Sequence, residues 1–196
     1  LAGTWEPDRI GLLGPRDDDL DLDLILGTAA TSLDVGRRTV ALDDGTDLAY
    51  DGLVIATGAR PRWLPATRGM AGVHVLRTLD DALALRADLD AGPRRVVVVG
   101  AGFIGAEVAA TVRGRGIDVT MVEPLPVPLG RVLGGEVAAT VAAVHRDEGV
   151  ELRLGVGEEA VEGGERVERV RLDDGSLVDA DVVVVGIGVV PNTDWL

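Results

Sequence analysis

The 196-residue sequence contains no cysteine and no lysine, and aromatic residues make up only 3% of it. The absence of cysteine excludes structural disulfides, thiolate metal sites and thiol catalysis from this chain. The two histidines, His74 and His145, lie far apart in the sequence and outside any cluster with the spacing of metal ligands. We therefore predict that no metal is bound and that both histidines lie at the surface or in loops.

Positive charge and long apolar runs are also scarce. The 19 arginine residues are outnumbered by 33 aspartate and glutamate residues, which gives a formal charge of −14. A nucleic acid or an anionic membrane requires clustered positive charge, so we predict neither as a partner. The longest apolar runs, 96–106 and 182–190, fall short of the roughly 20 residues of a membrane span, and neither is a terminal signal sequence. A hydrophobic content of 46% is ample for a core, and we expect a cytoplasmic globular protein.

A buried strand followed by a glycine-rich helix start lies in the middle of the sequence. Residues 95–99 read Arg-Val-Val-Val-Val, and the GxGxxG of Gly100, Gly102 and Gly105 leads directly into a helical pattern over 103–115. In a dinucleotide-binding fold the first glycine allows a tight turn and the second lets a pyrophosphate approach the backbone, while the third lets the helix pack close to the strand. The pattern predicts a strand, turn and helix with a phosphate site between them.

A carboxylate at the expected distance strengthens this interpretation. Glu123 ends the next predicted strand, 119–123, and stands 23 residues after Gly100 (123 minus 100). Dinucleotide folds place here the acidic residue that accepts hydrogen bonds from the hydroxyls of the adenosine ribose. The alternative is a glycine-rich turn in an ordinary buried strand–helix unit, but it does not account for the coincidence of strand, glycines, helix and acid.

The first 61 residues are typical of β structure preceded by a loop. We expect one short helical turn at 6–10 and then strands at 17–24, 28–33, 38–42 and 53–56, the second and third of which form a hairpin and the last of which is buried. The aspartates at the start of 17–24 lack the spacing and central glycine of an EF-hand loop. We therefore interpret them as the solvated start of a strand and not as a calcium site.

The rest of the sequence alternates between helix and strand patterns. Thr78 as N-cap and Asp81 three residues later predict a helix that ends at Gly92 and Pro93. Further elements are predicted as a helix spaced by Val137, Val141 and Val144, a strand at 150–154, an antiparallel meander over 158–178 and a buried strand at 182–185. We predict that the strands at Val96, Val119, Val150 and Val182 form one parallel sheet with helices on its faces.

Two parts of the sequence repeat each other. Residues 42–45 and 172–175 both read Leu-Asp-Asp-Gly at an offset of 130 (172 minus 42), and Asp51, Gly58 and Pro61 match Asp181, Gly188 and Pro191 at the same offset. Upstream, 23–27 resembles 151–155 at an offset of 128 (151 minus 23), so a two-residue insertion separates the blocks. We interpret the repeat as a duplicated dinucleotide-type domain.

The repeat predicts where a first glycine fingerprint would lie. Gly100 precedes Gly155 by 55 residues (155 minus 100), so its counterpart would precede Gly27 by the same distance, at about position −28 (27 minus 55). We therefore expect the sequence to be a fragment. It would contain the second half of one dinucleotide-type domain, a complete second one, and the start of a return to the first.

Two such domains, one inserted in the other, resemble the FAD- and NAD(P)H-binding domains of the pyridine nucleotide–disulfide oxidoreductase superfamily. Segments 50–61, 76–82, 99–107 and 186–192 are most similar to bacterial NADH-dependent ferredoxin and rubredoxin reductases. The resemblance implies a Rossmann-like α/β fold of three layers, a parallel sheet with an antiparallel β-meander, next to part of a second, FAD-type domain. It implies a partial FAD-binding-type domain at 1–64, an NAD(P)H-binding domain at 65–188 and a return segment at 189–196.

The resemblance implies the NADH-binding portion of an FAD-dependent oxidoreductase, a flavoprotein of electron transfer. In such a reductase hydride passes from NADH to FAD and electrons then pass singly to a ferredoxin-type iron–sulfur protein, with no side chain needed as catalytic acid or base. The fragment alone is expected to be inactive. Two alternatives stay open, namely a disulfide or CoA-disulfide reductase of the same superfamily and an NAD-binding module without turnover.

The resemblance also assigns residues to the two cofactors. For NADH these are Gly100, Gly102, Phe103, Ile104 and Gly105 at the pyrophosphate, Glu123 and Arg131 near the adenosine, and Glu107, Gly186, Ile187 and Gly188 at the nicotinamide. Thr57, Gly58 and Arg77 would contact FAD in the complete protein. A simpler role stays open for several of these residues. Glu107 is also favourable in the first half of a helix, and Arg131 could be a solvated loop residue. Thr57 and Gly58 are also explained by a turn that ends a strand. The edge of 53–56 is expected to pair with a second chain.

Overall fold

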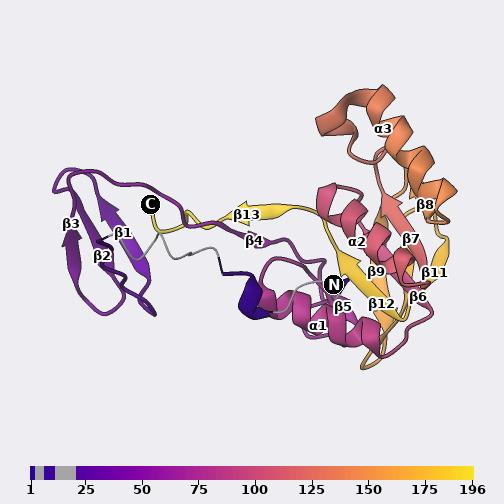
Figure 1. Ribbon diagram of the computed structural model, residues 1–196, viewed down its shortest axis with the longest axis horizontal. Coiled ribbons are helices and arrows are strands. Elements are labelled where there is room, and N and C mark those ends of the chain that lie inside the picture. The colour runs from indigo at the N-terminus through magenta and orange to yellow at the C-terminus, as the bar shows by residue number, and fades with distance from the viewer. Residues whose placement is uncertain (3–6, 12–20) are drawn as a thin grey trace. The chain divides into compact units, whose positions relative to one another are not determined.

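The computed structural model describes residues 1–2, 7–11 and 21–196. These residues form two compact units, a larger one made mainly of Pro61–Val189 and a smaller one made of the described residues between 7 and 60 together with 190–196 (Figure 1). Residues 17–20 of the first predicted strand and the start of the turn predicted at 6–10 lie outside the described residues. The rest of that turn is a 3-10 helix, η1 (Pro7–Arg9).

A five-stranded parallel sheet forms the centre of the larger unit. Its strands are β5 (Val73–His74), β6 (Arg95–Val99), β7 (Asp118–Glu123), β8 (Glu151–Leu154) and β12 (Val182–Val185), in the order β5-β12-β6-β7-β8. Every neighbouring pair is parallel, which confirms the predicted sheet and adds β5 to it. The valines of β6 and β12 are at most 3% exposed, as expected where both faces of a sheet are covered.

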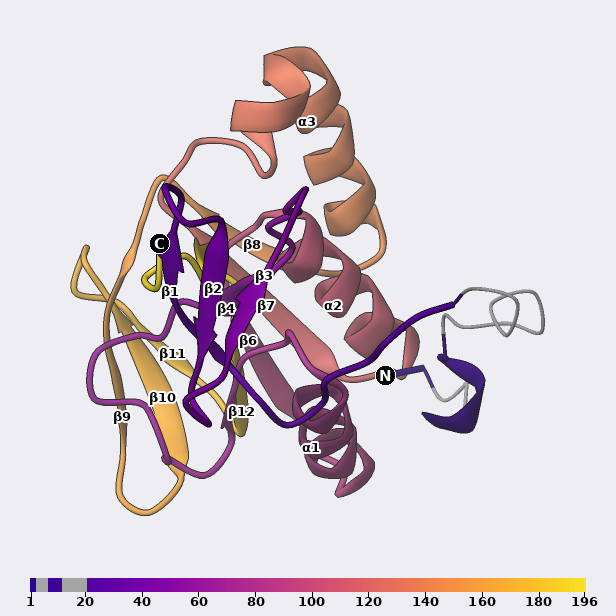
Figure 2. The ribbon, with the colours of Figure 1, turned by 90° about the vertical axis from the view of Figure 1, so that its left-hand side faces the viewer.

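The sheet lies between a layer of helices and an antiparallel meander (Figure 2). Helices α1 (Leu79–Asp90) and α2 (Phe103–Gly114) pack against one face, and the meander of β9 (Glu158–Gly163), β10 (Val167–Leu172) and β11 (Leu177–Asp179) covers the other. Val96 and Val98 share a core cluster with the helices, while Val97 and Val99 share one with the meander, because successive side chains of a strand point to opposite faces. The predicted three-layer α/β fold is therefore confirmed.

The predicted capping box begins α1. The Asp81 N–H donates to the Thr78 hydroxyl oxygen at 3.1 Å, and the Thr78 N–H donates to an Asp81 carboxylate oxygen at 2.8 Å. The helix ends at Asp90, two residues before Gly92. None of the helices among the described residues is long and apolar enough to be a membrane-spanning segment.

The smaller unit contains a second meander, which repeats the first in three dimensions. Strands β1 (Ala30–Asp34), β2 (Thr39–Leu42) and β3 (Asp47–Ala49) pair antiparallel in sequence order. The Asp43 N–H donates to the carbonyl oxygen of Ala29 at 2.9 Å, and the Asp173 N–H donates to that of Gly157 at the same distance. The sequence repeat is thus also a repeat of backbone hydrogen bonds. A further pair, β4 (Ala59–Pro61) with β13 (Val189–Pro191), forms where the chain passes between the units.

The strands predicted at 53–56 and at the described end of 17–24 are absent. Both segments are irregular, and Val54 is 87% exposed and Leu24 60% exposed. Their counterparts in the repeat are β12, which pairs with β5 and β6, and β8, which pairs with β7. Among the described residues no strand lies beside either segment, so the backbone hydrogen bonds that define a strand are not formed.

Helix α3 (Gly130–Asp147) confirms the second predicted helix, but its buried face differs from the prediction. Val137 and Val144 are 53% and 56% exposed, while Ala138, Ala142 and His145 are buried. The small alanine side chains let this face of α3 pack closely against the rest of the unit.

The prediction that both histidines lie at the surface or in loops was wrong. His145 is 8% exposed, and burial lowers the pKa of its imidazole because the charged form loses its hydration. His74 lies in β5, with Nε2 2.7 Å from a carboxylate oxygen of Asp88. The described residues contain no group of three or more side chains that could hold a metal ion.

Candidate nucleotide-binding site

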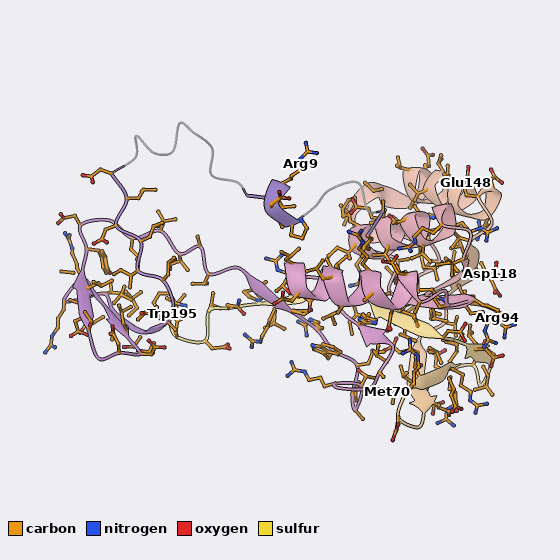
Figure 3. The ribbon with its side chains drawn as sticks, turned by 60° about the horizontal axis from the view of Figure 1, so that its bottom comes forward. Arg9, Met70, Arg94, Asp118, Glu148 and Trp195 are labelled. Carbon is orange, nitrogen blue, oxygen red and sulfur yellow. The ribbon has the colours of Figure 1, made fainter. Side chains whose placement is uncertain are left out.

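A cleft of about 550 Å³ lies at the carboxyl ends of β12, β6 and β7. It is formed by the glycine turn after β6, the start of α3, the residues that follow β7 and the 185–189 segment that ends β12. The opposite edge of the sheet carries Arg94 and Asp118, which lie together at the far end of this unit (Figure 3). In open parallel sheets the carboxyl edge is where ligands bind, so this cleft is the candidate site.

The three glycines of the fingerprint have different structural roles. Gly100 has a φ of 97°, and a Cβ there would lie 2.5 Å from the carbonyl oxygen of Gly186. A Cβ at Gly105 would overlap the carbonyl oxygen of Gly100. Gly102 faces open space, since a Cβ there would have no protein atom within 4 Å. Packing therefore requires the first and third glycines, while the second keeps room for a ligand beside the backbone.

The start of α2 provides hydrogen-bond donors next to this room. Its N-cap is Gly102, which has no side chain to cap the helix. The N–H groups of the first turn have no acceptor within a helix, and Phe103 and Ile104 are 53% and 40% exposed. An anion is stabilised at such a terminus by the free N–H groups and the helix dipole. The residues present therefore fit the pyrophosphate of a dinucleotide.

The carboxylate of Glu123 is fixed beside the glycine turn. One oxygen accepts the Ala101 N–H at 2.8 Å, and the other accepts the Leu125 N–H at 3.1 Å. Each oxygen of a carboxylate has a second lone pair, so both can still accept a hydrogen bond from a ligand hydroxyl. The side chain is therefore held in one place and retains the capacity that recognition of a ribose needs.

The cleft brings together nine of the eleven residues predicted for NADH and also Glu158, which was not predicted. Arg131 lies in the first turn of α3 and is exposed. Gly186 lies on the other side of the fingerprint, where its N–H donates to the Val99 carbonyl oxygen at 2.7 Å. The two remaining predicted residues do not line the cleft, since Gly105 is buried against the Gly100 carbonyl oxygen and Glu107 is exposed on α2. Strand order is the signal that finds Glu158, because it follows β8 at the same edge of the sheet.

The residues predicted for FAD belong to two different units. Thr57 and Gly58 lie in the smaller unit, where the Thr57 hydroxyl donates to the Asn192 carbonyl oxygen at 2.7 Å and the Asn192 N–H donates to the Gly58 carbonyl oxygen at 3.0 Å. Arg77 lies in the larger unit, and its N–H donates to Asp81 at 3.0 Å. Within the described residues of the smaller unit there is no α-helix to bind a second pyrophosphate, so these residues do not fit FAD by themselves.

Known proteins with similar sequences and structures are reductases. Rhodocoxin reductase from Rhodococcus erythropolis is 40% identical over 194 residues, which are 96% of this chain and 45% of the relative. The ferredoxin–NAD(+) reductase component of the p-cumate 2,3-dioxygenase system from Pseudomonas putida is 44% identical over 173 residues, 87% of this chain and 42% of the relative. The crystal structure of a covalent putidaredoxin reductase–putidaredoxin complex matches with a TM-score of 0.89 and 37% identity, over 99% of this chain and 48% of that chain.

The chain thus spans less than half the length of the relatives it matches. A family profile described as pyridine nucleotide-disulphide oxidoreductase matches residues 15–196. Because this match covers nearly the whole sequence and agrees with the glycine turn, the parallel sheet and the meander, the chain belongs to the pyridine nucleotide-disulphide oxidoreductase family.

Proposed function

We propose that this chain is the NADH-binding portion of an FAD-dependent reductase that passes hydride from NADH to FAD and then electrons to a ferredoxin-type iron–sulfur protein. The observation that carries the proposal is the cleft in which an open space at Gly102, the uncapped start of α2 and the fixed carboxylate of Glu123 lie together. The names of the relatives support the ferredoxin-type partner. We further propose that residues 65–188 are the NAD(P)H-binding domain, 1–64 part of an FAD-binding-type domain and 189–196 the return segment.

The chain's own contribution to this reaction is to position the nucleotide. The N–H groups at Phe103 and Ile104 would bind the pyrophosphate, and Glu123 would accept both adenosine ribose hydroxyls. The Gly186–Gly188 turn lies on the other side of Gly100 from Glu123, so it would contact the nicotinamide end. NADH and FAD, when bound, supply the hydride donor and acceptor, and no side chain has to move a proton.

The remaining assignments stay predictions. They place Arg131 near the adenosine, Glu107 near the nicotinamide, and Thr57, Gly58 and Arg77 at the FAD of the complete protein. A cytoplasmic location and a dimer formed through residues 53–56 also stay predictions. For the dimer, the support is that no strand of the described residues pairs with that segment.

The cleft should prefer NADH to NADPH. The extra phosphate of NADPH would place a second negative charge against Glu123, whereas the ribose hydroxyls of NADH give this carboxylate two charge-assisted hydrogen bonds. We expect NADPH to bind more weakly by about 1–3 kcal/mol, the cost of leaving a buried polar group without its hydrogen bond. Calorimetric titration of the chain with each nucleotide measures the two dissociation constants. Equal dissociation constants would contradict the assignment of Glu123.

The electron-transfer proposal is tested on the full-length flavoprotein. NADH should bleach its flavin absorbance under anaerobic conditions, and an added ferredoxin should reoxidise the flavin with one electron per ferredoxin. A flavin that is reoxidised only by a disulfide or CoA-disulfide substrate would overturn the ferredoxin-type partner. NADH binding without flavin reduction would overturn the reductase in favour of a non-catalytic NAD-binding module.

A further inference from the structure

The strand order fixes which part of a dinucleotide would lie over which strand. At the carboxyl edge of the sheet β12 is followed by β6, then β7, then β8. Gly186 follows β12, Gly100 follows β6, Glu123 ends β7 and Gly155 follows β8. With the pyrophosphate at Gly102 and the ribose at Glu123, the base attached to that ribose would lie farther out, toward β8, about 5 Å away at the usual spacing of strands.

Glu158 lies at this outer position. The Gly155 N–H donates to the backbone carbonyl oxygen of Glu123 at 2.9 Å, and the Gly157 N–H donates to a carboxylate oxygen of Asp173 at the same distance. The first bond fixes the turn between β8 and β9 against the end of β7, and the second fixes it against the residue that follows β10. Glu158, the first residue of β9, is partly buried and lines the cleft together with Glu123 and Leu125.

The carboxylate of Glu158 differs from the other glutamates of β9. Glu159 pairs with Arg171 at 3.2 Å, and Glu162 pairs with Arg169 at 3.4 Å. Within the described parts of the chain Glu158 forms neither an ion pair nor a side-chain hydrogen bond. A partly buried carboxylate without such a partner retains its full capacity to accept hydrogen bonds, and the open space of the cleft lies beside it.

We propose that Glu158 recognises the adenine ring, by accepting a hydrogen bond from its exocyclic amine. This inference rests on the proposed NADH site and adds to it a residue that selects the base. The amine of adenine is a donor, and a carboxylate is an acceptor only, so the pair is complementary. A base with a carbonyl oxygen at the same position would instead place an acceptor against the carboxylate.

The test compares NADH with reduced nicotinamide hypoxanthine dinucleotide, in which a carbonyl oxygen replaces the adenine amine. For the unchanged chain we expect the hypoxanthine analogue to bind about tenfold more weakly, the effect of one lost hydrogen bond to a charged group. Glu158→Ala should lower the affinity for NADH to that for the analogue and so remove the preference for adenine. Glu158→Gln should narrow or invert the preference, because the amide nitrogen can donate to the carbonyl oxygen of hypoxanthine.

Glu159→Gln is the matched control, since Glu159 is the next residue of the same strand and pairs with Arg171 outside the cleft. It should retain the full preference for NADH. Equal affinities of the unchanged chain for the two nucleotides, or an undiminished preference in Glu158→Ala, would overturn the role of Glu158. Failure of the unchanged chain to bind NADH at all would instead overturn the proposed function, so the two failures are distinguishable.

Discussion

Replacing Gly102 by alanine should weaken NADH binding at least tenfold and leave the fold intact, whereas replacing Gly105 by alanine should destabilise the fold itself. A Cβ at Gly102 has no protein atom within 4 Å, and the backbone there has a φ of −76° that alanine adopts readily. It would occupy the space where the pyrophosphate meets the N–H groups of α2, and one lost hydrogen bond to a charged group costs about 1.5–3 kcal/mol. The stability should change by only about 0.5 kcal/mol.

Gly105→Ala has the opposite expected result. Its Cβ would overlap the Gly100 carbonyl oxygen, a backbone atom that cannot rotate away, so α2 would have to move from β6. Such overpacking costs about 1–3 kcal/mol or more, and we expect the upper end because the obstacle is backbone. Thermal unfolding followed by circular dichroism measures stability, and calorimetry measures NADH affinity.

Gly164→Ala provides the control for both substitutions. Gly164 lies in the turn between β9 and β10, away from the cleft, and a Cβ there also has no protein atom within 4 Å. It should change neither the unfolding temperature nor the NADH affinity. A Gly102→Ala chain that binds NADH like the unchanged chain would show that the nucleotide does not approach the backbone at this turn.

The second large effect concerns FAD, which this chain should not retain although it should bind NADH. The sequence contains one GxGxxG, which opens α2 in the larger unit. In the smaller unit, the Thr57 hydroxyl and the Gly58 carbonyl already bond to Asn192, and the described residues offer no α-helix N-terminus for a second pyrophosphate. A flavin nucleotide would therefore lack the donors that hold its two phosphates.

The measurement is an absorbance spectrum after the chain is mixed with FAD and desalted, alongside an NADH titration by calorimetry. The protein should be colourless and should bind NADH. Without bound FAD, the chain should also fail to oxidise NADH when an artificial electron acceptor is added. A yellow protein with stoichiometric FAD would contradict this prediction and would mean that Thr57, Gly58 and Arg77 suffice to hold the flavin.

The sequence by itself determined the elements whose signals are local. Residues 95–123 carry a run of valines, three glycines at fixed spacing and an acid at the end of the next strand, and each feature has a direct physical role in the strand, turn and helix. The capping box of Thr78 and the two Leu-Asp-Asp-Gly turns were equally predictable, because their hydrogen bonds join residues within a few positions of one another. Most of the candidate site was found from such signals.

Only the tertiary structure decided the features that depend on neighbours distant in sequence. Residues 53–56 have the apolar pattern of a buried strand but form none, whereas the two-residue β5, with no clear pattern, becomes an edge strand beside β12. His145 is buried, and Val137 and Val144 are exposed, because packing selects the alanine face of α3. Glu158 joins the cleft only through the order of the strands. A strand needs a partner for its backbone hydrogen bonds, and a side chain needs a neighbouring surface against which it is buried. Neither the partner nor the surface is a property of a local stretch of sequence.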